Sequence, residues 1–393
     1  MPDRRKFIAS GIAGLAASVL GAGQVRITGV DLYDIRIPVS KDEAEAGLNH
    51  AFNVAEISTD AGVKGYSFAG PGNSQLAAVR QLLVGRDLFS IEQLLADGLE
   101  KWGGVEHALW DAIGRIAKQP VYRLLGGASD RVKAYVTCVW KGKADQQHVS
   151  YQEQAGQAVR LKQAGFKGMK IRAWRPNPLD DADCCSEIRA ATGPDFAIMF
   201  DRTAHLPESV GQKVWDFDTG LKVARALQRS GAYWLEEPFA RDDYRTPAQL
   251  ASMVDMPITG GEGYVGVGAF QKCLLNRTYD ILQPEGRGSG GILTCRKIAF
   301  MAEGYHVPCI LHGTMSLMLA GWLQATFAIG SEWQEVALIT PPLLPQQQWA
   351  PGVQVLRTKE MYRIENGEIL ASDFPGIGLD VNPAALAEFR IRA

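Results

Sequence analysis

The strongest constraint on the fold is a repeated pattern, in which a short apolar run ends in a polar residue and an amphipathic helix follows. Typical runs are "GMKIR", "AIMFD" and "AYWLE". From Val132 onward the pattern predicts strands that end near Trp140, Arg172, Asp201, Glu236, Glu262, Glu285, His312 and Glu335. The ends from Asp201 to Glu335 follow one another at intervals of 23 to 35 positions. Each interval has room for one strand, one helix and two loops.

This alternation favours a modified (β/α)8 barrel in the α/β class, although an open α/β sheet would alternate in the same way. Before the barrel, the runs "VRITGVDLYDIRIPV" and "FNVAEIST" predict strands of an α+β capping domain. We therefore expect four parts, which are an export signal (1–23), the capping domain (24–132), the barrel (133–345) and a C-terminal segment that returns to the capping domain (346–393).

The polar strand ends predict the position of an active site. In a (β/α)8 barrel the C-terminal ends of the strands converge on one opening. Five acidic ends, one histidine and the pair Lys170 and Arg172 around that opening are costly unless a positive charge neutralises the acids. A divalent cation is the prediction, and an ion-pair network without metal is the alternative.

The stretch "YWLEEPF" places two carboxylates, Glu236 and Glu237, directly before Pro238. Because side chains alternate along a strand, neighbouring residues cannot face the same way unless the strand is ending. Glu236 is therefore predicted to turn inward as a metal ligand, with Glu237 as its structural neighbour. A strand that ends in solvent is the other interpretation.

The motifs together resemble the enolase superfamily and, within it, the mandelate racemase and muconate lactonizing enzyme group. The helix and linker "VEHALWDAIGRIAKQPVYRLLGG" and the strand ends "FDRTAH", "WLEEP" and "GGEGY" carry the resemblance, which covers nearly all of the chain after the export signal. It implies that Asp201, Glu236 and Glu262 hold one Mg²⁺ per subunit. Three carboxylates suit this hard cation.

The resemblance also implies removal of the proton next to a carboxylate, a reaction that needs a base and stabilisation of charge on oxygen. His312 is the candidate base, and Glu285, one unit earlier, is expected to orient it. Glu335 resembles the group that hydrogen-bonds the substrate carboxylate. Taken alone, His312 is better interpreted as a satisfied core histidine, and Glu285 one unit earlier is what favours the base.

Two departures from the family pattern affect the expected reaction. The chain has Lys170-Ile171-Arg172 where racemase-like members have Lys-x-Lys, and it has Glu285 where Asp is usual. Arginine stays protonated, so Arg172 is interpreted as a clamp for the substrate carboxylate, which Lys170 assists. Loss of a second base favours dehydration over racemisation.

The predicted function is Mg²⁺-dependent dehydration of an acid sugar to a 2-keto-3-deoxy acid, by a lyase. The alternatives are a racemase, epimerase or cycloisomerase, which are isomerases, and a non-catalytic relative that binds an acid sugar or a partner. Residues 38–52 are the candidate specificity loop. His205, Tyr264 and Glu237 are candidates for substrate contact, and a surface-loop histidine is the other reading of His205.

Composition narrows the partners and the compartment. A formal charge of -2, without a basic cluster, argues against nucleic acid. We expect a small carboxylate substrate and a homo-oligomer. The six cysteines lack paired spacing and are predicted to be buried hydrophobes. The segment "MPDRRKFIASGIAGLAASVLGAGQ" resembles a twin-arginine export signal and predicts a periplasmic protein. Its apolar run is too short to span a membrane comfortably. The alternative interpretation is a short buried helix, which would imply a cytoplasmic protein.

Overall fold

A computed structural model describes residues 23–45, 47–140, 148–204, 213–339 and 341–391. The export-signal prediction, except for its last residue, lies outside these ranges. Within them, no helix combines the length and the apolar character needed to cross a membrane. The cysteines are all free and buried, as predicted.

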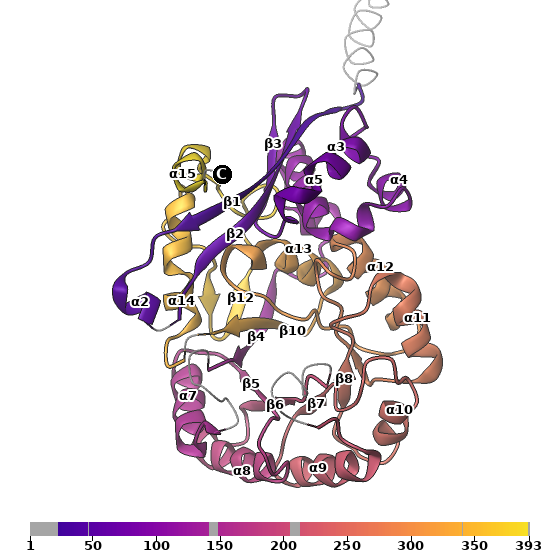
Figure 1. The fold of residues 1–393 in the computed structure, drawn as a ribbon, viewed down its shortest axis with the longest axis vertical. Coiled ribbons are helices and arrows are strands. Elements are labelled where there is room, and N and C mark those ends of the chain that lie inside the picture. Colours follow the sequence, from indigo (N-terminus) through magenta and orange to yellow (C-terminus); the bar gives the residue numbers. More distant parts are fainter. Residues whose placement is uncertain (1–22, 46, 141–147, 205–212, 340, 392–393) are drawn as a thin grey trace, which may run out of the picture.

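The N-terminal cap is an antiparallel sheet covered by helices (Figure 1). Its strands follow in the order β1 (Ile27–Ile37), β2 (His50–Thr59) and β3 (Lys64–Ser67). The cap helices are α2 (Lys41–Glu45), α3 (Leu76–Leu83), α4 (Ile91–Ala96), α5 (Gly103–Ala117) and α6 (Val121–Leu124). Gly65 allows β3 to approach α5, because a Cβ at this position would overlap the carbonyl oxygen of Ala108.

The barrel strands are β4 (Arg131–Cys138), β5 (Gly168–Arg172), β6 (Ala197–Asp201), β7 (Trp234–Glu236), β8 (Ile258–Gly260), β9 (Ile281–Leu282) and β10 (Trp333–Leu338). Each strand from β4 to β8 pairs in parallel with the next, and β10 pairs in parallel with β4. Between β9 and β10, parallel bridges at Cys309, His312 and Thr314 occupy the remaining strand position. The sheet therefore closes, and the predicted (β/α)8 barrel with an α+β cap is confirmed.

The barrel helices form an outer ring in Figure 1: α7 (Tyr151–Gln163), α8 (Asp180–Thr192), α9 (Phe217–Arg229), α10 (Thr246–Ala251), α11 (Gly266–Asn276), α12 (Ile292–Glu303) and α13 (Leu319–Ile329). Side-chain caps begin two of them, since Ser150 accepts from the N–H of Glu153 and Asp216 accepts from the N–H of Thr219. Helix α13 is buried on nearly all sides, because the cap covers its outer face.

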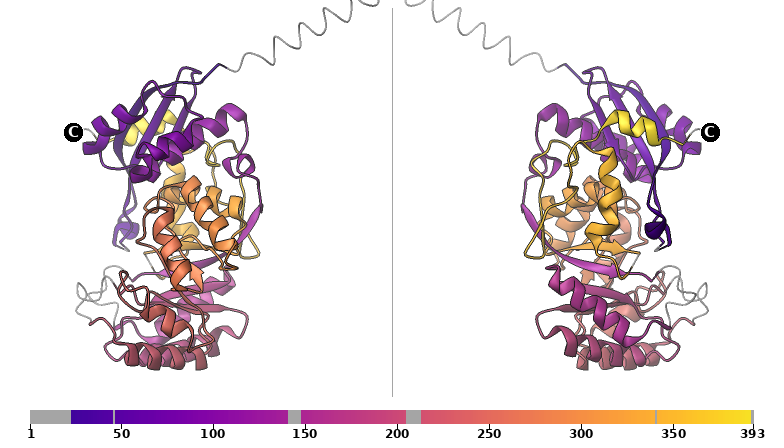
Figure 2. Two further views of the ribbon diagram at one scale, coloured as in Figure 1. Left: turned by 90° about the vertical axis from the view of Figure 1, so that its right-hand side faces the viewer. Right: turned by 90° about the vertical axis from the view of Figure 1, so that its left-hand side faces the viewer.

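The C-terminal segment contains α14 (Pro345–Trp349), β11 (Ile364–Glu365), β12 (Glu368–Leu370) and α15 (Pro383–Phe389). Strand β12 pairs antiparallel with β4, and α15 lies against the cap sheet (Figure 2). The N–H of Ile391 donates to the carbonyl oxygen of Asp34 at 2.8 Å. The described part of the chain thus begins and ends in the same domain.

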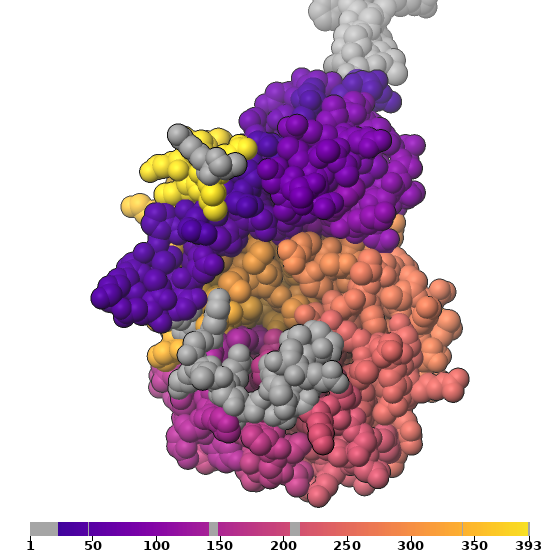
Figure 3. Space-filling model, viewed as in Figure 1, coloured from indigo at the N-terminus to yellow at the C-terminus, as the bar shows by residue number. Residues whose placement is uncertain are grey.

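The segment that carries α2 projects from the cap beside the barrel (Figure 3). At its end, His50 Nε2 lies 2.6 Å from the carbonyl oxygen of Gln348 in α14. The predicted specificity loop is therefore tied to the segment that follows β10.

Candidate active site

The barrel interior is built in two layers because side chains alternate along each strand. The lower layer is apolar and contains Tyr135, Met199, Trp234, Ile281, Ile310 and Trp333. The residues two positions further along the same strands are Thr137, Asp201, Glu236, Gln283, His312 and Glu335. A polar layer thus lies directly above an apolar one, at the C-terminal ends of the strands.

Lys170 lies within the polar layer and is fully buried. Its Nζ is 2.6 Å from Oε2 of Glu236, 2.9 Å from Oε1 of Glu335 and 3.7 Å from Oδ2 of Asp201. Burial acts to lower the pKa of Lys170, but the three carboxylates outweigh it and raise the pKa. The ammonium is therefore charged.

Glu335 lies inside its strand rather than at the end of it. We expected the last strand to end near Glu335, but β10 continues to Leu338, because β4 offers backbone partners up to Cys138. The carboxylate of Glu335 accepts from the Thr137 hydroxyl and, at 2.8 Å, from the N–H of Gly313. Burial acts against ionisation, but Lys170 and then His312 outweigh it, so the pKa of Glu335 lies well below its usual range.

Glu236 has one satisfied and one unsatisfied oxygen. Oε2 accepts from Lys170 and, at 3.0 Å, from Nε2 of Gln283. Oε1 is buried and has no hydrogen-bond partner among the described residues. Burial raises the pKa of Glu236, and the charge of Lys170 opposes this shift. This carboxylate would gain from a further positive charge beside Oε1.

Asp201 is buried at the end of β6 and is held by its own loop and by β5. Oδ1 accepts from the N–H of Thr203 at 2.7 Å, and Oδ2 forms an ion pair with Nη1 of Arg172. The guanidinium of Arg172 also donates to Thr203 Oγ1 at 3.1 Å and lies over the ring of Trp174. Asp201 and Arg172 thus lie side by side at the ends of the paired strands β5 and β6.

Glu237 and Glu262 are joined by an arginine that the motifs did not indicate. Nε of Arg241 lies 2.9 Å from Oε2 of Glu237, and Nη2 lies 2.9 Å from Oε2 of Glu262. The backbone of Glu237 is left-handed, with φ of 42°. This turn explains how two adjacent glutamates both point into the protein, Glu236 at the barrel centre and Glu237 at the loop.

His312 is placed beside the acids, but its expected partner is not. Nε2 of His312 lies 3.6 Å from Oε2 of Glu262. The backbones of Glu285 and His312 pair as a parallel bridge, yet the Glu285 carboxylate accepts from the N–H of Gly288. Nδ1 of His312 is buried and meets no partner in the part of the chain that the structure describes. The structure therefore lacks the expected carboxylate–histidine hydrogen bond, because the longer Glu285 side chain reaches its own loop.

Of the remaining candidates for substrate contact, one lies outside the polar layer and the other lies outside the residues that the structure describes. The hydroxyl of Tyr264 donates to the carbonyl oxygen of Arg241, and its ring stacks on Tyr244 with centroids 5.6 Å apart. His205 falls outside the described residues. Tyr264 therefore supports the loop that carries Arg241.

The comparisons with known proteins agree with this arrangement. Residues 151–385, more than half of the chain, match the family described as "Enolase C-terminal domain-like". The chain is a member of the enolase superfamily. This confirms the resemblance predicted from its motifs.

Relatives of this superfamily member include several acid-sugar dehydratases. An arabinonate dehydratase of Saccharolobus solfataricus is 30% identical over 292 residues, which cover 74% of this chain and 72% of the relative. A D-galactonate dehydratase of Ralstonia nicotianae is 30% identical over 353 residues, which cover 85% of this chain and 89% of the relative. Cycloisomerases also occur among the relatives.

A solved structure resembles the fold along nearly its whole length. It is a D-glucarate dehydratase from Agrobacterium tumefaciens complexed with magnesium, with a TM-score of 0.77 and 25% identity. The similarity covers 94% of this chain and 100% of that chain. The two dehydratase relatives and this neighbour are lyases, whereas the cycloisomerases among the relatives are isomerases.

The residues present fit a hard divalent cation. Ligand atoms of Glu236, Glu262 and His312 all lie within 4.8 Å of one another, and Glu236 is also the residue with the unsatisfied Oε1. Asp201, the third ligand that the sequence predicts, is instead held by Arg172. Carboxylate oxygens on neighbouring strands are the donor type that Mg²⁺ prefers.

Four residues of the site were missed by sequence reasoning. Gln283 and Thr137 could have been found, because each follows an inward apolar residue by two positions, as Glu236 does. The Gly313 N–H and Arg241 carried no such signal, since both lie in loops. Their roles depend on backbone geometry that a motif does not record.

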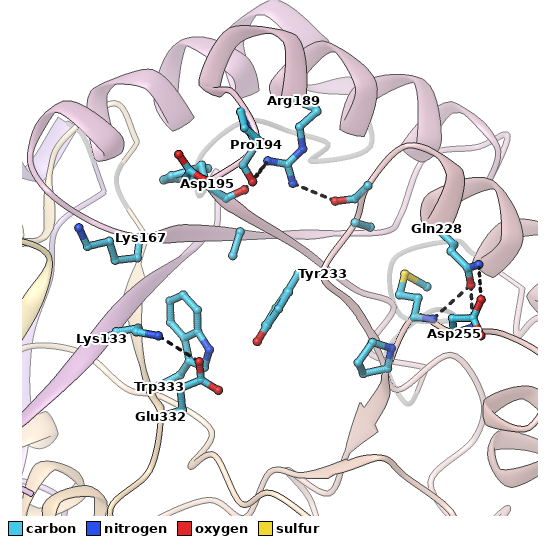
Figure 4. A pocket seen from close by; sticks show the side chains of 16 residues that line it. Lys133, Lys167, Arg189, Pro194, Asp195, Gln228, Tyr233, Asp255, Glu332 and Trp333 are labelled. Atoms are coloured by element: carbon cyan, nitrogen blue, oxygen red, sulfur yellow. Dashed lines mark hydrogen bonds and ion pairs between the residues drawn. The ribbon is translucent and has the colours of Figure 1, made fainter.

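A cavity of about 630 Å³ lies at the opposite end of the barrel, where the strands begin (Figure 4). Its charged groups are largely satisfied: Lys133 pairs with Glu332 at 3.1 Å, and Arg189 donates to backbone carbonyls. In an enolase-superfamily barrel this face is remote from the polar layer, so we assign it no chemistry.

Proposed function

We propose that this protein is a Mg²⁺-dependent dehydratase that converts an acid sugar into a 2-keto-3-deoxy acid. The observation that carries the proposal is the position of His312, whose Nε2 lies 3.6 Å from the Glu262 carboxylate in a group of potential metal ligands. The names of the relatives support the substrate class.

Asp201, Glu236 and Glu262 are proposed to hold one Mg²⁺. When bound, the ion supplies positive charge beside the substrate carboxylate as negative charge develops on its oxygens. To hold the ion, Asp201 would give up part of its contact with Arg172. Arg172 then faces the substrate carboxylate as a permanent positive charge.

His312 is proposed to act as both base and acid. Nε2 takes the proton from the carbon next to the carboxylate, and the same nitrogen returns it to the hydroxyl that leaves from the next carbon. The C–H and C–O bonds break, one water leaves, and the enol product becomes the 2-keto acid. One histidine can serve both steps when the proton and the hydroxyl leave from the same face.

Lys170 and Glu335 are proposed to organise the charges. The carboxylates around Lys170 hold its proton, so it is a poor second base, and this supports dehydration over racemisation. The ionised Glu335 accepts hydrogen bonds and fixes the Lys170 ammonium beside Glu236. Glu285 is proposed to influence His312 through the backbone bridge between their strands.

A proton NMR screen tests the proposal directly. The purified protein is incubated with Mg²⁺ and a library of sugar acids in D₂O. The expected result is loss of one acid and growth of a 2-keto-3-deoxy product, both abolished by EDTA. If no acid in a library covering the aldonic and aldaric stereoisomers reacts, the dehydratase proposal is overturned.

A cycloisomerase is the second candidate, because such enzymes occur among the relatives. Cycloisomerisation would appear in the same screen as an isomer formed without loss of water, and epimerisation would appear as deuterium at the carbon next to the carboxylate. A non-catalytic relative would need no tight cation site. Titration with Mg²⁺ therefore separates that third reading from both enzymes.

We also propose that residues 38–52 select the sugar, since the described part of this segment is tied to α14 through His50. Export through the paired arginines and assembly into a homo-oligomer are further proposals from the sequence. Cell fractionation tests the first, and analytical ultracentrifugation tests the second.

A further inference from the structure

We propose that Arg241 is a positioning residue, which holds the Glu262 carboxylate in the orientation that binds a divalent cation while Glu237 holds Arg241. The inference rests on the proposed function, because that function makes Glu262 a metal ligand. Arg241 itself lies in the loop after β7 and belongs to none of the motifs that predicted the site.

Arg241 joins the two carboxylates with different edges of its guanidinium. Nε lies 2.9 Å and 3.1 Å from the two carboxylate oxygens of Glu237, and Nη2 lies 2.9 Å from Oε2 of Glu262. A guanidinium is planar and its N–H groups point in fixed directions. One arginine can therefore set the distance and angle between two carboxylates, whereas the single ammonium of a lysine cannot.

The Glu237 end of this bridge is the fixed end. Its side chain is 1% exposed, whereas that of Glu262 is 24% exposed. The N–H of Gly261 points at Oε1 of Glu237 from 3.4 Å. The left-handed backbone of Glu237 is unfavourable for a residue with a side chain and persists only where the surroundings determine it. The buried glutamate thus anchors the arginine, and the arginine restrains the accessible glutamate.

Two further contacts define the position of Arg241. The hydroxyl of Tyr264 donates to its carbonyl oxygen. Gly263 makes room for the guanidinium, because a Cβ at that position would overlap Nη1. Replacing Gly263 by alanine would therefore displace the guanidinium without removing its charge.

Glu262 has a competing partner. Its Oε2, which Arg241 holds, also lies 3.6 Å from Nε2 of His312. Without Arg241, no other contact of Glu262 within the described residues would prevent its carboxylate from turning toward the His312 imidazole. The carboxylate would then be withdrawn from the cation, and the base would lose its access to substrate.

The test is Mn²⁺ binding to the metal-free protein without substrate, measured by electron paramagnetic resonance. We expect Arg241→Ala to weaken Mn²⁺ binding about 10- to 100-fold. Arg241→Lys should not restore the affinity, and Gly263→Ala should weaken it as well. Arg245→Ala, which removes an exposed arginine four residues later, is the matched control and should bind like the wild type. Thermal unfolding in EDTA shows whether each variant is folded.

A double-mutant cycle tests the anchoring by Glu237. If Glu237 acts through Arg241, the double variant Glu237→Gln, Arg241→Ala binds Mn²⁺ about as well as Arg241→Ala alone. The inference would be overturned if the losses of the two substitutions were fully additive. It would also be overturned if both Arg241→Ala and Gly263→Ala bound Mn²⁺ within about twofold of the wild type. Neither result would affect the proposed function. A wild type that binds no Mn²⁺ would overturn the proposed function together with the inference.

Discussion

Nζ of Lys170 lies 2.6 Å from Oε2 of Glu236 inside the barrel, and both side chains are almost completely buried. The same ammonium is within ion-pair distance of Glu335 and Asp201. One buried lysine thus serves three buried acids, which is why Glu236 retains an unsatisfied oxygen. The polar layer is short of positive charge, and this shortage is what a divalent cation would correct.

Removal of this lysine should destabilise the metal-free protein. Lys170→Met leaves three buried carboxylates without their shared cation, so we expect a loss of about 3–5 kcal/mol in the free energy of unfolding. Mg²⁺ should restore part of it. Urea denaturation with EDTA and with Mg²⁺ measures both effects. Lys133→Met, at an exposed pair with Glu332, is the control; a Lys170→Met loss as small as the control's would contradict the charge argument.

A second prediction concerns acid stability. His107 in α5 is buried, and burial lowers the pKa of its imidazole to about 4. In the unfolded chain this imidazole takes up a proton near pH 6.5, whereas in the folded protein it stays neutral until about pH 4. The stability that the buried imidazole contributes is therefore fully present above pH 6.5 and is lost as the pH falls toward 4. We expect the wild type to lose about 3 kcal/mol relative to His107→Asn over this window.

Denaturation at stepwise pH in EDTA measures this difference. His306→Asn, which removes an exposed histidine, controls for the loss of one titrating group. A constant difference between the wild type and His107→Asn from pH 7.5 to pH 4 would show that burial does not govern this imidazole.

The third prediction concerns the close packing of strand β3 of the cap sheet against α5. Gly65→Ala forces a Cβ into the carbonyl of Ala108, so either β3 or α5 must shift. We expect a loss of about 1–3 kcal/mol in unfolding free energy. Gly29→Ala is the control, because its Cβ would meet Ser58 at 3.7 Å, an ordinary contact. Equal stabilities for the two variants would disprove the close approach.

The fourth prediction concerns export. If the paired arginines are read by a twin-arginine pathway, replacing both Arg4 and Arg5 by lysine should keep the protein in the cytoplasm. Immunoblots of periplasmic and cytoplasmic fractions measure the distribution. A double variant that reaches the periplasm as efficiently as the wild type would refute the signal.

Much of the fold followed from periodicity. The alternation along each strand put Asp201, Glu236 and His312 on one inner layer, and the spacing of the strand ends predicted the closed barrel. The end of β10 could not be predicted, because strand length depends on its partner β4 rather than on its own residues.

The site was less predictable than the fold, because its details depend on loops and rotamers. Glu285 follows its strand as expected, yet its carboxylate bonds the nearby Gly288 rather than His312. The left-handed turn at Glu237 and the reach of Arg241 arise from contacts between successive loops. A sequence pattern places a residue at a rim, but it does not place the atoms at the end of its side chain.

The most direct test of the account compares the wild type with His312→Asn on the acid sugar that the screen identifies. NMR would follow the initial rate of dehydration at saturating Mg²⁺, and Mn²⁺ binding would be measured in parallel. We expect His312→Asn to lose at least about 10³-fold in rate while it binds Mn²⁺ within about tenfold of the wild type. A variant that dehydrates the sugar at nearly the wild-type rate would contradict the assignment of His312 as the base.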